Sequence, residues 1–354
     1  MKRNIGIVLI SNCLAGAENS VYNLILNSKD NLYLFVNEEI FNHYSHLNKR
    51  IINLGKIYNR NKVIQYINYL KVRSRLKRLI KSEKIKVLVL FLVNSFIVTS
   101  YLKICLVPNL RGSDIIEYLS PPKNIKEKIL KSIFNKVFNI SKKIISVSRH
   151  QIQNLPEKYK KKTVVIPNGV DSKVFKPLKN IKQKKNVVLF TGRFLEIKGI
   201  REILAVAKKL LQYEFWFAGQ GPLADLINLP NTKNLGFKST KELVKLYNQS
   251  TICIAPSYRE GFSNVGLEVI SCSRALICTP PFSEYIENGK DGIIIPSKDE
   301  KILKDAIVKL MTNKKLRKKL EKNARKKALK YTWEEVAKKY LKVFKEVIEN
   351  EKKK

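Results

Sequence analysis

Two glutamates lie close together in a chain that is otherwise strongly basic. Glu260 and Glu268 belong to the stretch APSYREGFSNVGLEVI, with seven residues between them. A predicted strand, TICIAPS, ends just before Glu260, and Glu268 falls in the first turns of a predicted helix, so both carboxylates can point into one pocket. Carboxylates accept hydrogen bonds, and we expect this pair to hold sugar hydroxyl groups. The alternative is a helix-capping glutamate beside an unrelated surface glutamate.

A second candidate site is the basic loop in LFTGRFLEIKGIREILAVAKKLL. A predicted strand ends at Thr191 and Gly192, the loop carries Arg193 and Lys198, and a helix begins near Gly199. Open α/β sheets bind ligands at the carboxyl ends of their strands, and a helix N-terminus with nearby cations attracts phosphate. The pattern predicts a diphosphate site, with an ordinary basic surface loop as the alternative.

The chain offers no pattern for a metal or an organic cofactor. It contains no D-x-D sequence, and its five cysteines and three histidines show no metal-ligand spacing. We therefore expect Arg193, Lys198 and helix dipoles, rather than a divalent cation, to neutralise a leaving diphosphate. A further loop, FAGQGPL, places Gly219 and Gly221 at the same sheet edge, either for close backbone approach to a ligand or for a tight turn.

Apolar strand-like runs alternate with helical patterns through most of the chain. Continuous Val, Ile and Leu runs such as IKVLVLFL and NVVLFTG are typical of parallel strands buried on both faces. The polar segment 176–186 resembles an exposed linker. We predict an α/β protein with two Rossmann-like doubly wound domains, residues 1–178 and 179–335. A terminal helix, 336–354, is expected to pack back toward the N-terminal domain.

The formal net charge of +40 is a property of both halves of the chain. It indicates either an anionic partner or a compositional bias with lysines on solvated faces. Scattered cysteines favour a reducing compartment, and the apolar stretch 87–102 is too short and too polar for a membrane span. We expect a cytoplasmic protein, with the inner face of the membrane as a further candidate location.

These motifs together resemble a family 4 glycosyltransferase with the GT-B fold, in which two Rossmann-like domains face each other across a cleft. The resemblance extends over nearly the whole chain. It is carried by GAENSVYNL, VIPNGVDSKVF, TGRFLEIKG, AGQGPL, PSYREGFSNVGLEVI and ENGKDGIIIP. It implies a retaining, metal-independent transfer of a sugar from a nucleotide diphosphate to a glycan or lipid-linked acceptor in surface polysaccharide or glycolipid synthesis.

The same resemblance implies roles for individual residues. Arg193 and Lys198 would contact the diphosphate, Glu268 the ribose hydroxyls and Glu260 the donor sugar. The remaining implied donor-binding residues are Gly16, Gly236, Phe237, Gly261, Phe262, Ser263, Asn264 and Val265. The first of these departs from the family pattern, since many relatives have Gly-Gly where this chain has Ala15-Gly16.

A second departure concerns Arg111, which stands where many relatives carry a histidine near the donor sugar. Arg111 is expected to bind an acidic sugar, to bind a phosphate of the acceptor, or to pair with Asp114. The donor's identity therefore stays open.

The acceptor is expected on the N-terminal domain, where the segment PKNIKEKILKSIFNKVFNISKK is both basic and amphipathic. This pattern favours either a helix on an anionic membrane surface or an ordinary helix that covers the sheet. A non-catalytic basic protein on the same scaffold, binding membrane or nucleic acid, is the alternative function. No nucleic-acid recognition motif is present, so we expect no nucleic-acid partner.

Overall fold

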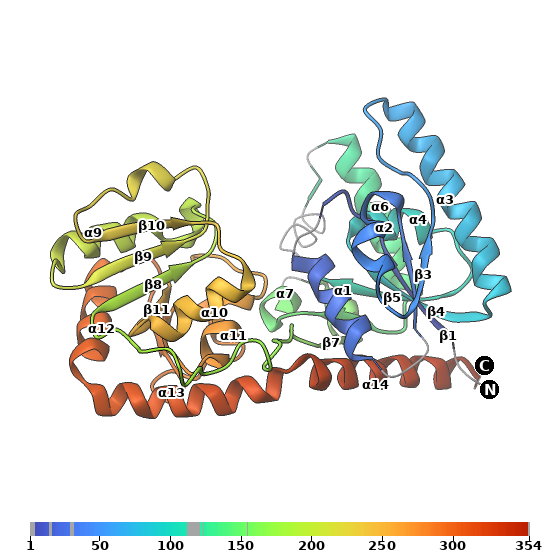
Figure 1. The fold of residues 1–354 in the computed structure, drawn as a ribbon. Helices are drawn as coiled ribbons and strands as arrows, with labels where there is room; N and C mark the ends of the chain where they lie inside the picture. Colours follow the sequence, from blue (N-terminus) through green and yellow to red (C-terminus); the bar gives the residue numbers. More distant parts are fainter. Residues whose placement is uncertain are drawn as a thin grey trace. The chain divides into compact units, whose positions relative to one another are not determined.

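The structure, a computed structural model, describes residues 4–13, 16–28, 32–111, 121–122, 124–153 and 155–352. It divides into two compact units (Figure 1). The first unit comprises Met1–Asn168 together with Trp333–Lys354, and the second comprises Gly169–Thr332.

The first unit contains a parallel sheet in the order β3-β2-β1-β4-β5-β6-β7. Its strands are β1 (Asn4–Leu9), β2 (Leu32–Val36), β3 (Arg50–Asn53), β4 (Ile85–Phe91), β5 (Cys105–Leu110), β6 (Ile144–Ser146) and β7 (Thr163–Val165). Its helices are α1 (Gly16–Asn27), α2 (Glu38–Ser45), α3 (Lys62–Ser82), α4 (Val93–Thr99), α6 (Ile125–Ile140), α7 (Arg149–Gln153), α8 (Glu157–Lys160) and α14 (Trp333–Lys352).

Alternating side chains of β1 separate two apolar layers in this unit. Ile7 and Leu9 pack in a core with residues of α1, α2 and α14. Val8 faces the opposite core, which includes residues of α3, α4 and α6. Because successive strand residues point to opposite faces, this arrangement leaves the sheet buried on both sides.

Helix α14 covers one face of the first unit although it follows the second unit in the chain. The residues of its apolar face are buried there, with Leu341 partly buried. They are Trp333, Val336, Ala337, Tyr340, Phe344 and Val347. Asn109 Nδ2, in β5, donates a 2.7 Å hydrogen bond to the hydroxyl of Tyr340.

The second unit contains a parallel sheet in the order β10-β9-β8-β11-β12-β13. Its strands are β8 (Val187–Thr191), β9 (Glu214–Ala218), β10 (Thr232–Gly236), β11 (Ile252–Ala255), β12 (Ala275–Cys278) and β13 (Ile293–Ile294). Its α-helices are α9 (Ile200–Lys209), α10 (Thr240–Gln249), α11 (Asn264–Ser271), α12 (Glu300–Thr312) and α13 (Lys314–Ala328). Short 3-10 helices are η1 (Glu196–Lys198), η2 (Ala224–Leu226), η3 (Pro280–Phe282) and η4 (Leu329–Tyr331).

The predicted α/β class with two parallel sheets is confirmed. The apolar stretch 87–102 forms most of β4 and then α4, as expected of a buried strand and a short helix. Within the described residues, no helix is both long and apolar enough to cross a bilayer.

The boundary between the units lies earlier than the linker composition indicated. Phe175 packs in a core of the second unit, and Leu178 N donates a 2.8 Å hydrogen bond to Asn248 Oδ1. Asn248 Nδ2 in turn donates to the carbonyl oxygen of Lys176. These contacts attach the start of the polar segment to the second unit, so the division falls after Asn168 rather than after residue 178.

Helix α6 mainly supports one of the two alternatives that its sequence left open. Phe134, Val137 and Phe138 are buried in the core beneath α3 and α4. Ile125 and Ile129, in the first turns, remain exposed. Most of the apolar face therefore covers the sheet, and apolar side chains are exposed in the first turns and at Ile140 in the last turn.

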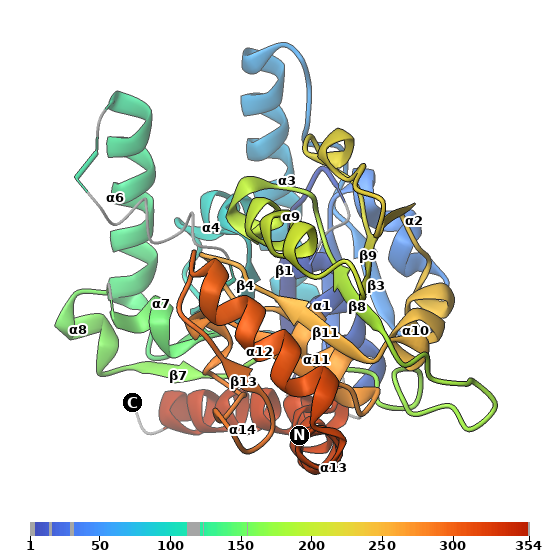
Figure 2. The same cartoon turned by 90° about the vertical axis from the view of Figure 1, so that its left-hand side faces the viewer.

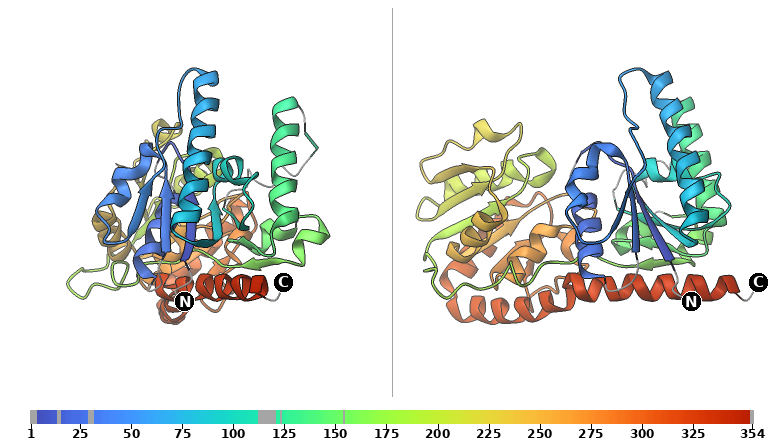
Figure 3. Two further views of the ribbon diagram at one scale, coloured as in Figure 1. Left: turned by 90° about the vertical axis from the view of Figure 1, so that its right-hand side faces the viewer. Right: turned by 45° about the vertical axis from the view of Figure 1, so that its right-hand side comes forward.

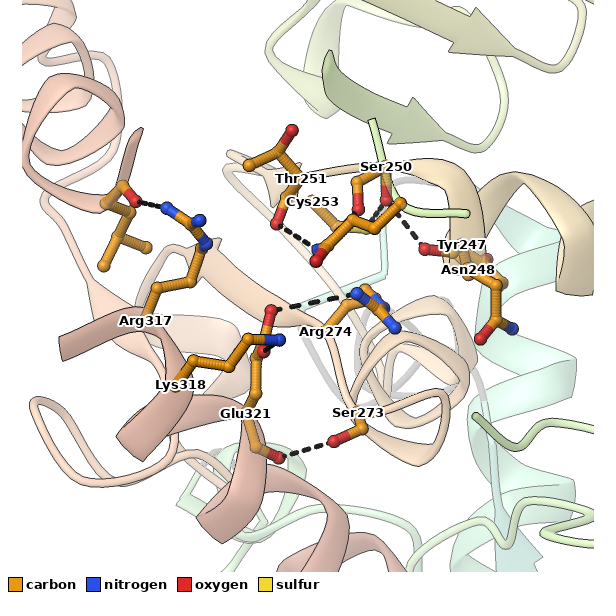
Figure 4. Close-up of polar contacts among 12 residues, drawn as sticks. Tyr247, Asn248, Ser250, Thr251, Cys253, Ser273, Arg274, Arg317, Lys318 and Glu321 are labelled. Atoms are coloured by element: carbon orange, nitrogen blue, oxygen red, sulfur yellow. Dashed lines mark hydrogen bonds and ion pairs between the residues drawn. The ribbon is translucent and has the colours of Figure 1, made fainter. Parts of the chain in front are cut away.

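A buried ionic cluster holds α13 against the loop before β12 (Figure 4). Glu321 Oε2 lies 2.8 Å from Lys318 Nζ, and Glu321 Oε1 lies 3.9 Å from Arg274 Nη1. The Ser273 hydroxyl donates to the backbone carbonyl of Glu321 at 3.0 Å. The side chains of Arg274 and Glu321 are 11% and 4% exposed, so this pair is largely removed from water.

Replacing Glu321 by alanine should lower the free energy of unfolding by about 3 kcal/mol, because Arg274 would lose its buried counter-charge. Glu335→Ala is the matched control, since Glu335 pairs with Lys338 at the surface and should cost at most about 1 kcal/mol. Urea denaturation of both variants measures the difference. Equal small losses would show that the buried cluster contributes no more than a surface pair.

Candidate functional site

Two loops meet closely at the carboxyl edge of the second sheet. Gly192 N, after β8, donates to the carbonyl oxygen of Ala218 at 3.0 Å, and Phe194 N donates to the carbonyl oxygen of Gln220 at 2.9 Å. A Cβ atom at Gly219 would lie 1.8 Å from the Gly192 carbonyl oxygen. The glycine is therefore required for the two loops to approach, and their backbones line one side of a pocket.

Gly199 allows a second close approach at the same edge. It has φ +74°, and a Cβ atom there would lie 2.6 Å from the carbonyl oxygen of Pro256. Tyr258 N donates to the carbonyl oxygen of Ile197 at 2.9 Å. These contacts bring η1, which ends at Lys198, against the loop that leads from β11 to α11 and carries Glu260.

Lys198 and Glu260 form an ion pair across this contact. Lys198 Nζ lies 2.5 Å from Glu260 Oε1, and their side chains are 18% and 12% exposed. Both charges are mostly removed from water, so the pair is electrostatically stronger than a surface salt bridge. An anion that binds Lys198 must either displace the Glu260 carboxylate or share the ammonium group with it.

A pocket of about 290 Å³ opens beside these loops. This volume is near the lower end of the range for small-molecule sites. The lining residues are Thr191, Gly192, Arg193, Ala218, Gly219, Gln220, Phe237, Lys238, Leu243, Tyr247, Val265 and Glu268. They come from the ends of β8 and β9, from the segment between β10 and α10, and from α10 and α11, next to the β8–β11 junction where the strand order reverses. Open α/β sheets bind ligands at such a junction.

The carboxyl group of Glu268 is held by a chain of hydrogen bonds inside the pocket. The Tyr247 hydroxyl donates to Glu268 Oε2 at 2.8 Å and lies 3.0 Å from Thr191 Oγ1. Tyr247 is fully buried, whereas part of the Glu268 residue is exposed to solvent. Desolvation raises the pKa of the Glu268 carboxyl, and the hydrogen bond from Tyr247 partly opposes that shift.

An aromatic pair and a hydrogen bond from Tyr285 hold the loop before α11. The rings of Phe262 and Tyr285 lie 5.2 Å apart, and the Tyr285 hydroxyl donates to the Ser263 carbonyl oxygen at 2.9 Å. Ser263 is the N-cap residue of α11, and its side chain makes no capping hydrogen bond. The amide groups of the first turn are thus the natural donors for a ligand at this edge.

The structure brings together some of the residues that the sequence singled out. Arg193, Phe237, Val265 and Glu268 line the pocket. Lys198 and Glu260 form their pair at the same sheet edge. Gly236 ends β10 beside Phe237, and residues 261–264 form the turn into α11.

Two predicted site residues, Gly16 and Arg111, belong to the first unit. Gly16 begins α1, and a Cβ atom there would meet no described atom within 4 Å. Arg111 follows β5; its Nη1 donates to Asn168 Oδ1 and its Nη2 to the Tyr340 hydroxyl at 2.7 Å. Its guanidinium also lies 5.0 Å from the ring centre of Phe91. Asp114, the third partner considered for Arg111, lies outside the described residues.

No motif assigns a functional role to Tyr247, Lys238 or Leu243, all of which line the pocket. They lie on or just before α10. A usable signal was present, because Ser239 and Glu242 form a capping box at the start of that helix. This signal locates the helix but does not show that Tyr247 faces a carboxyl group.

Two family models match the chain, one in each half. The model described as Glycosyltransferase Family 4 matches residues 15–174, and the model described as Glycosyl transferases group 1 matches residues 171–327. The chain belongs to glycosyltransferase family 4. The second match covers every pocket residue, and the first covers Gly16 and Arg111.

Two curated relatives share about 30% of the aligned residues with this chain. An uncharacterized glycosyltransferase of Methanocaldococcus jannaschii is 32% identical over 58% of this chain and 60% of its own length. The N,N'-diacetylbacillosaminyl-diphospho-undecaprenol alpha-1,3-N-acetylgalactosaminyltransferase of Campylobacter jejuni is 30% identical over 64% of this chain. The chain spans 66% of that second relative.

Solved structures share the GT-B fold over almost the whole chain. Sucrose-phosphate synthase from Thermosynechococcus elongatus superposes with a TM-score of 0.78, at 16% identity, covering 98% of this chain and 100% of its own. HepE of Anabaena, in complex with UDP and glucose, superposes with a TM-score of 0.76, at 14% identity, covering 96% and 99%. The expected fold is therefore confirmed.

The raised pKa of Glu268 predicts how stability depends on pH. A carboxyl group whose pKa is higher in the folded chain contributes stability that is fully present below its unfolded value of 4.5 and is lost as the pH rises through the folded value. Glu268→Gln should therefore melt at a higher temperature than the unaltered protein near neutral pH, and the gap should close toward about pH 4. Melting curves across this pH range measure it.

Tyr247→Phe provides the matching comparison. Loss of the hydroxyl removes the hydrogen bond that lowers the pKa of Glu268, so the pH dependence should shift further toward neutral pH. If both variants follow the same pH curve as the unaltered protein, Glu268 is not desolvated in the folded chain.

Proposed function

We propose that the chain is a retaining glycosyltransferase that moves a sugar from a nucleotide diphosphate to a glycan or lipid-linked acceptor. The observation that carries this proposal is the pocket in which Arg193 and Glu268 lie together at the carboxyl edge of the second sheet. Glu268 accepts hydrogen bonds from ribose hydroxyls, and Arg193 faces the diphosphate. Membership of glycosyltransferase family 4 supports the same assignment.

UDP is the nucleotide to test first. HepE, whose fold this chain shares, was solved with UDP and with UDP-glucose. In this proposal the base lies near Gly236 and Phe237, and Tyr247 keeps the Glu268 carboxyl turned toward the ribose. The donor sugar meets Glu260 and the turn formed by residues 261–264.

The proposed reaction breaks the bond between the anomeric carbon and the diphosphate oxygen. The acceptor oxygen forms its bond on the same face, and its proton passes to the departing diphosphate oxygen. Lys198 exchanges part of its contact with Glu260 for the diphosphate as negative charge develops there. Stabilisation of that charge by Lys198, Arg193 and the first turn of α11 replaces a divalent cation, so the reaction needs no metal or organic cofactor.

The acceptor is proposed to be lipid-linked or a growing glycan in surface polysaccharide or glycolipid synthesis. The names of two curated relatives support this class: the Campylobacter enzyme acts on a diphospho-undecaprenol, and a Staphylococcus aureus relative is a capsular polysaccharide biosynthesis glycosyltransferase. Such an acceptor places the protein at the cytoplasmic face of a membrane.

Nucleotide binding should raise the melting temperature without metal. A ligand at a hundredfold excess over its dissociation constant stabilises the native state by about 2.7 kcal/mol. UDP, GDP, ADP and their common sugar conjugates are compared by thermal shift and calorimetry, first with EDTA and then with magnesium. We expect stabilisation by one nucleotide family in EDTA and its loss in Glu268→Ala. A chain that binds no nucleotide but binds duplex DNA would contradict the proposal.

Lys198→Ala should reduce turnover about 100-fold to 1000-fold, the usual effect of removing one preorganised contact to a developing charge. Arg201→Ala is the control, because Arg201 pairs with Glu196 at the surface two residues beyond Gly199. Initial rates of UDP release with a saturating donor measure both variants. Near-normal turnover in Lys198→Ala would remove this residue from the mechanism.

A further inference from the structure

Two helices of the first unit expose large apolar side chains in their first turns. On α3, Val63 and Tyr66 are 67% and 63% exposed, and Ile64, Ile67 and Leu70 are also exposed. On α6, Ile125 and Ile129 are exposed. We call these seven side chains the apolar tips. A water-soluble surface rarely keeps such a group of aliphatic and aromatic side chains without a binding role.

The apolar residues of α3 lie mainly on one face of the helix. Val63, Ile67 and Leu70 are spaced three and four residues apart, so their side chains are neighbours on the helix surface. The same face continues through Ser74 to Lys77 and Lys81. One face thus changes from apolar to basic along its length.

The rest of α3 is firmly attached to the first unit. Val72 and Leu76 are buried in its core. Arg73 donates hydrogen bonds to the carbonyl oxygens of Ile97 and Val98, at 2.8 Å and 3.0 Å. Tyr69 donates to Asn94 Oδ1 at 2.9 Å. The first turns of α3 therefore extend from a helix whose later turns are packed against the first unit.

Both apolar tips extend from the same end of the first unit. Helix α3 follows β3 and α6 follows β5, so each begins at the carboxyl edge of the parallel sheet. Figures 2 and 3 show the two helices rising from that end. The exposed ring of Tyr101 lies 4.9 Å from the Arg73 guanidinium of α3 and 3.6 Å from Lys136 Nζ of α6.

The basic residues near the apolar tips favour an anionic partner. Helix α3 carries seven Lys and Arg residues and no Asp or Glu. Six of them follow the exposed apolar turns, between Lys71 and Lys81. The apolar part, Val63–Leu70, is about 10 Å long at 1.5 Å per residue.

We propose that the apolar tips of α3 and α6 dock the first unit on an anionic lipid surface. The apolar side chains enter the boundary between headgroups and acyl chains. Lys71, Lys77 and Arg78 then stand at the level of the anionic headgroups, where each basic residue adds attraction. The carboxyl edge of the first sheet faces the lipid in this arrangement, so an acceptor carried by the membrane reaches the chain without leaving the bilayer.

Two other partners fit the same surface less well. Nucleic acid would be attracted by the basic half of α3, but its phosphates give no role to the exposed Val63, Ile67 and Ile125. A second copy of the chain would bring two basic helices together, and like charges would oppose that contact. An anionic lipid surface uses both halves of the helix.

Vesicle co-sedimentation of the full chain tests the proposal. We expect binding to vesicles of phosphatidylcholine with about 30% phosphatidylglycerol, much weaker binding to pure phosphatidylcholine, and a decrease as salt is raised. The triple change Val63→Ser, Ile67→Ser and Leu70→Ser should lower the partition coefficient at least tenfold, about what loss of two or three buried methylene groups produces. Unchanged partition of this variant would overturn the proposal.

A matched pair of controls separates the apolar tips from exposed apolar residues elsewhere. Leu211→Ser with Ile302→Ser alters two exposed apolar residues of the second unit and should leave vesicle binding unchanged. In Ile67→Trp, the added indole should show a blue-shifted emission on mixing with anionic vesicles. No shift would contradict insertion of this helix.

A second pair of controls separates α3 from the general positive charge of the chain. Lys77→Gln with Arg78→Gln removes two charges from α3, and Lys314→Gln with Lys315→Gln removes two from exposed positions of α13. The first pair should lower partition about tenfold at low salt, and the second should have little effect. Equal losses would show that binding follows overall charge and would overturn the proposed surface.

Different results would contradict the docking surface and the proposed transferase function. The serine variant of α3 should keep the UDP-induced thermal shift, because the pocket belongs to the second unit. Intact UDP binding with no vesicle binding by the unaltered chain would overturn the docking surface alone. Vesicle binding without nucleotide binding would contradict the transferase and leave the surface supported.

Discussion

Parallel pairing in both sheets forces the strands of each sheet to end at one edge. Every residue that lines the pocket of the second unit depends on that constraint. Thr191 and Ala218 end neighbouring strands, and Glu268 is carried on the helix that follows a third. Since the strand order reverses between β8 and β11, the connections leave in opposite directions and open a space between them. Sheet topology therefore determines where the pocket lies, and the side chains determine what it can bind.

Within that space, polar groups are fixed by neighbours that do not need to touch a ligand. Tyr247 holds one carboxyl group, and Tyr285 holds the backbone before α11. Both rings are fully or almost fully buried, so the hydroxyl groups at their ends have little freedom to turn away. A desolvated carboxyl group costs stability, and this cost is typical of a binding site that exchanges some folding free energy for preorganisation.

Much of the fold could be predicted from the sequence, because buried parallel strands appear as continuous apolar runs. The two strands that the sequence did not reveal, β3 and β10, are both at sheet edges. Their sequences, RIIN and TKNLG, lack the continuous apolar run by which the buried strands were recognised. The domain boundary differed for a related reason. A polar segment such as KPLKNIKQKKN gives no sign that Asn248, distant in the chain, binds its backbone.

Two charged residues that the motifs singled out, Arg193 and Glu268, line the pocket. The neutral Tyr247 was not singled out, because only packing of α10 against β8 brings its hydroxyl to Glu268. Arg111 is a further case. Its type indicated a charged partner, whereas its hydrogen bonds run to Asn168 and Tyr340, which are 57 and 229 residues away in the chain.

Helix α14 has a consequence for how the chain is made. One apolar face of the first sheet packs against α1, α2 and α14, and the last of these follows the entire second unit in the sequence. During synthesis at about 5–20 residues per second, some 165 residues separate the end of the first segment from the start of this helix, a delay of about 10 to 30 seconds. During this delay the part of the first unit's core that packs against α14 lacks that helix. The core of the first unit is therefore completed by a segment that is made after the whole second unit.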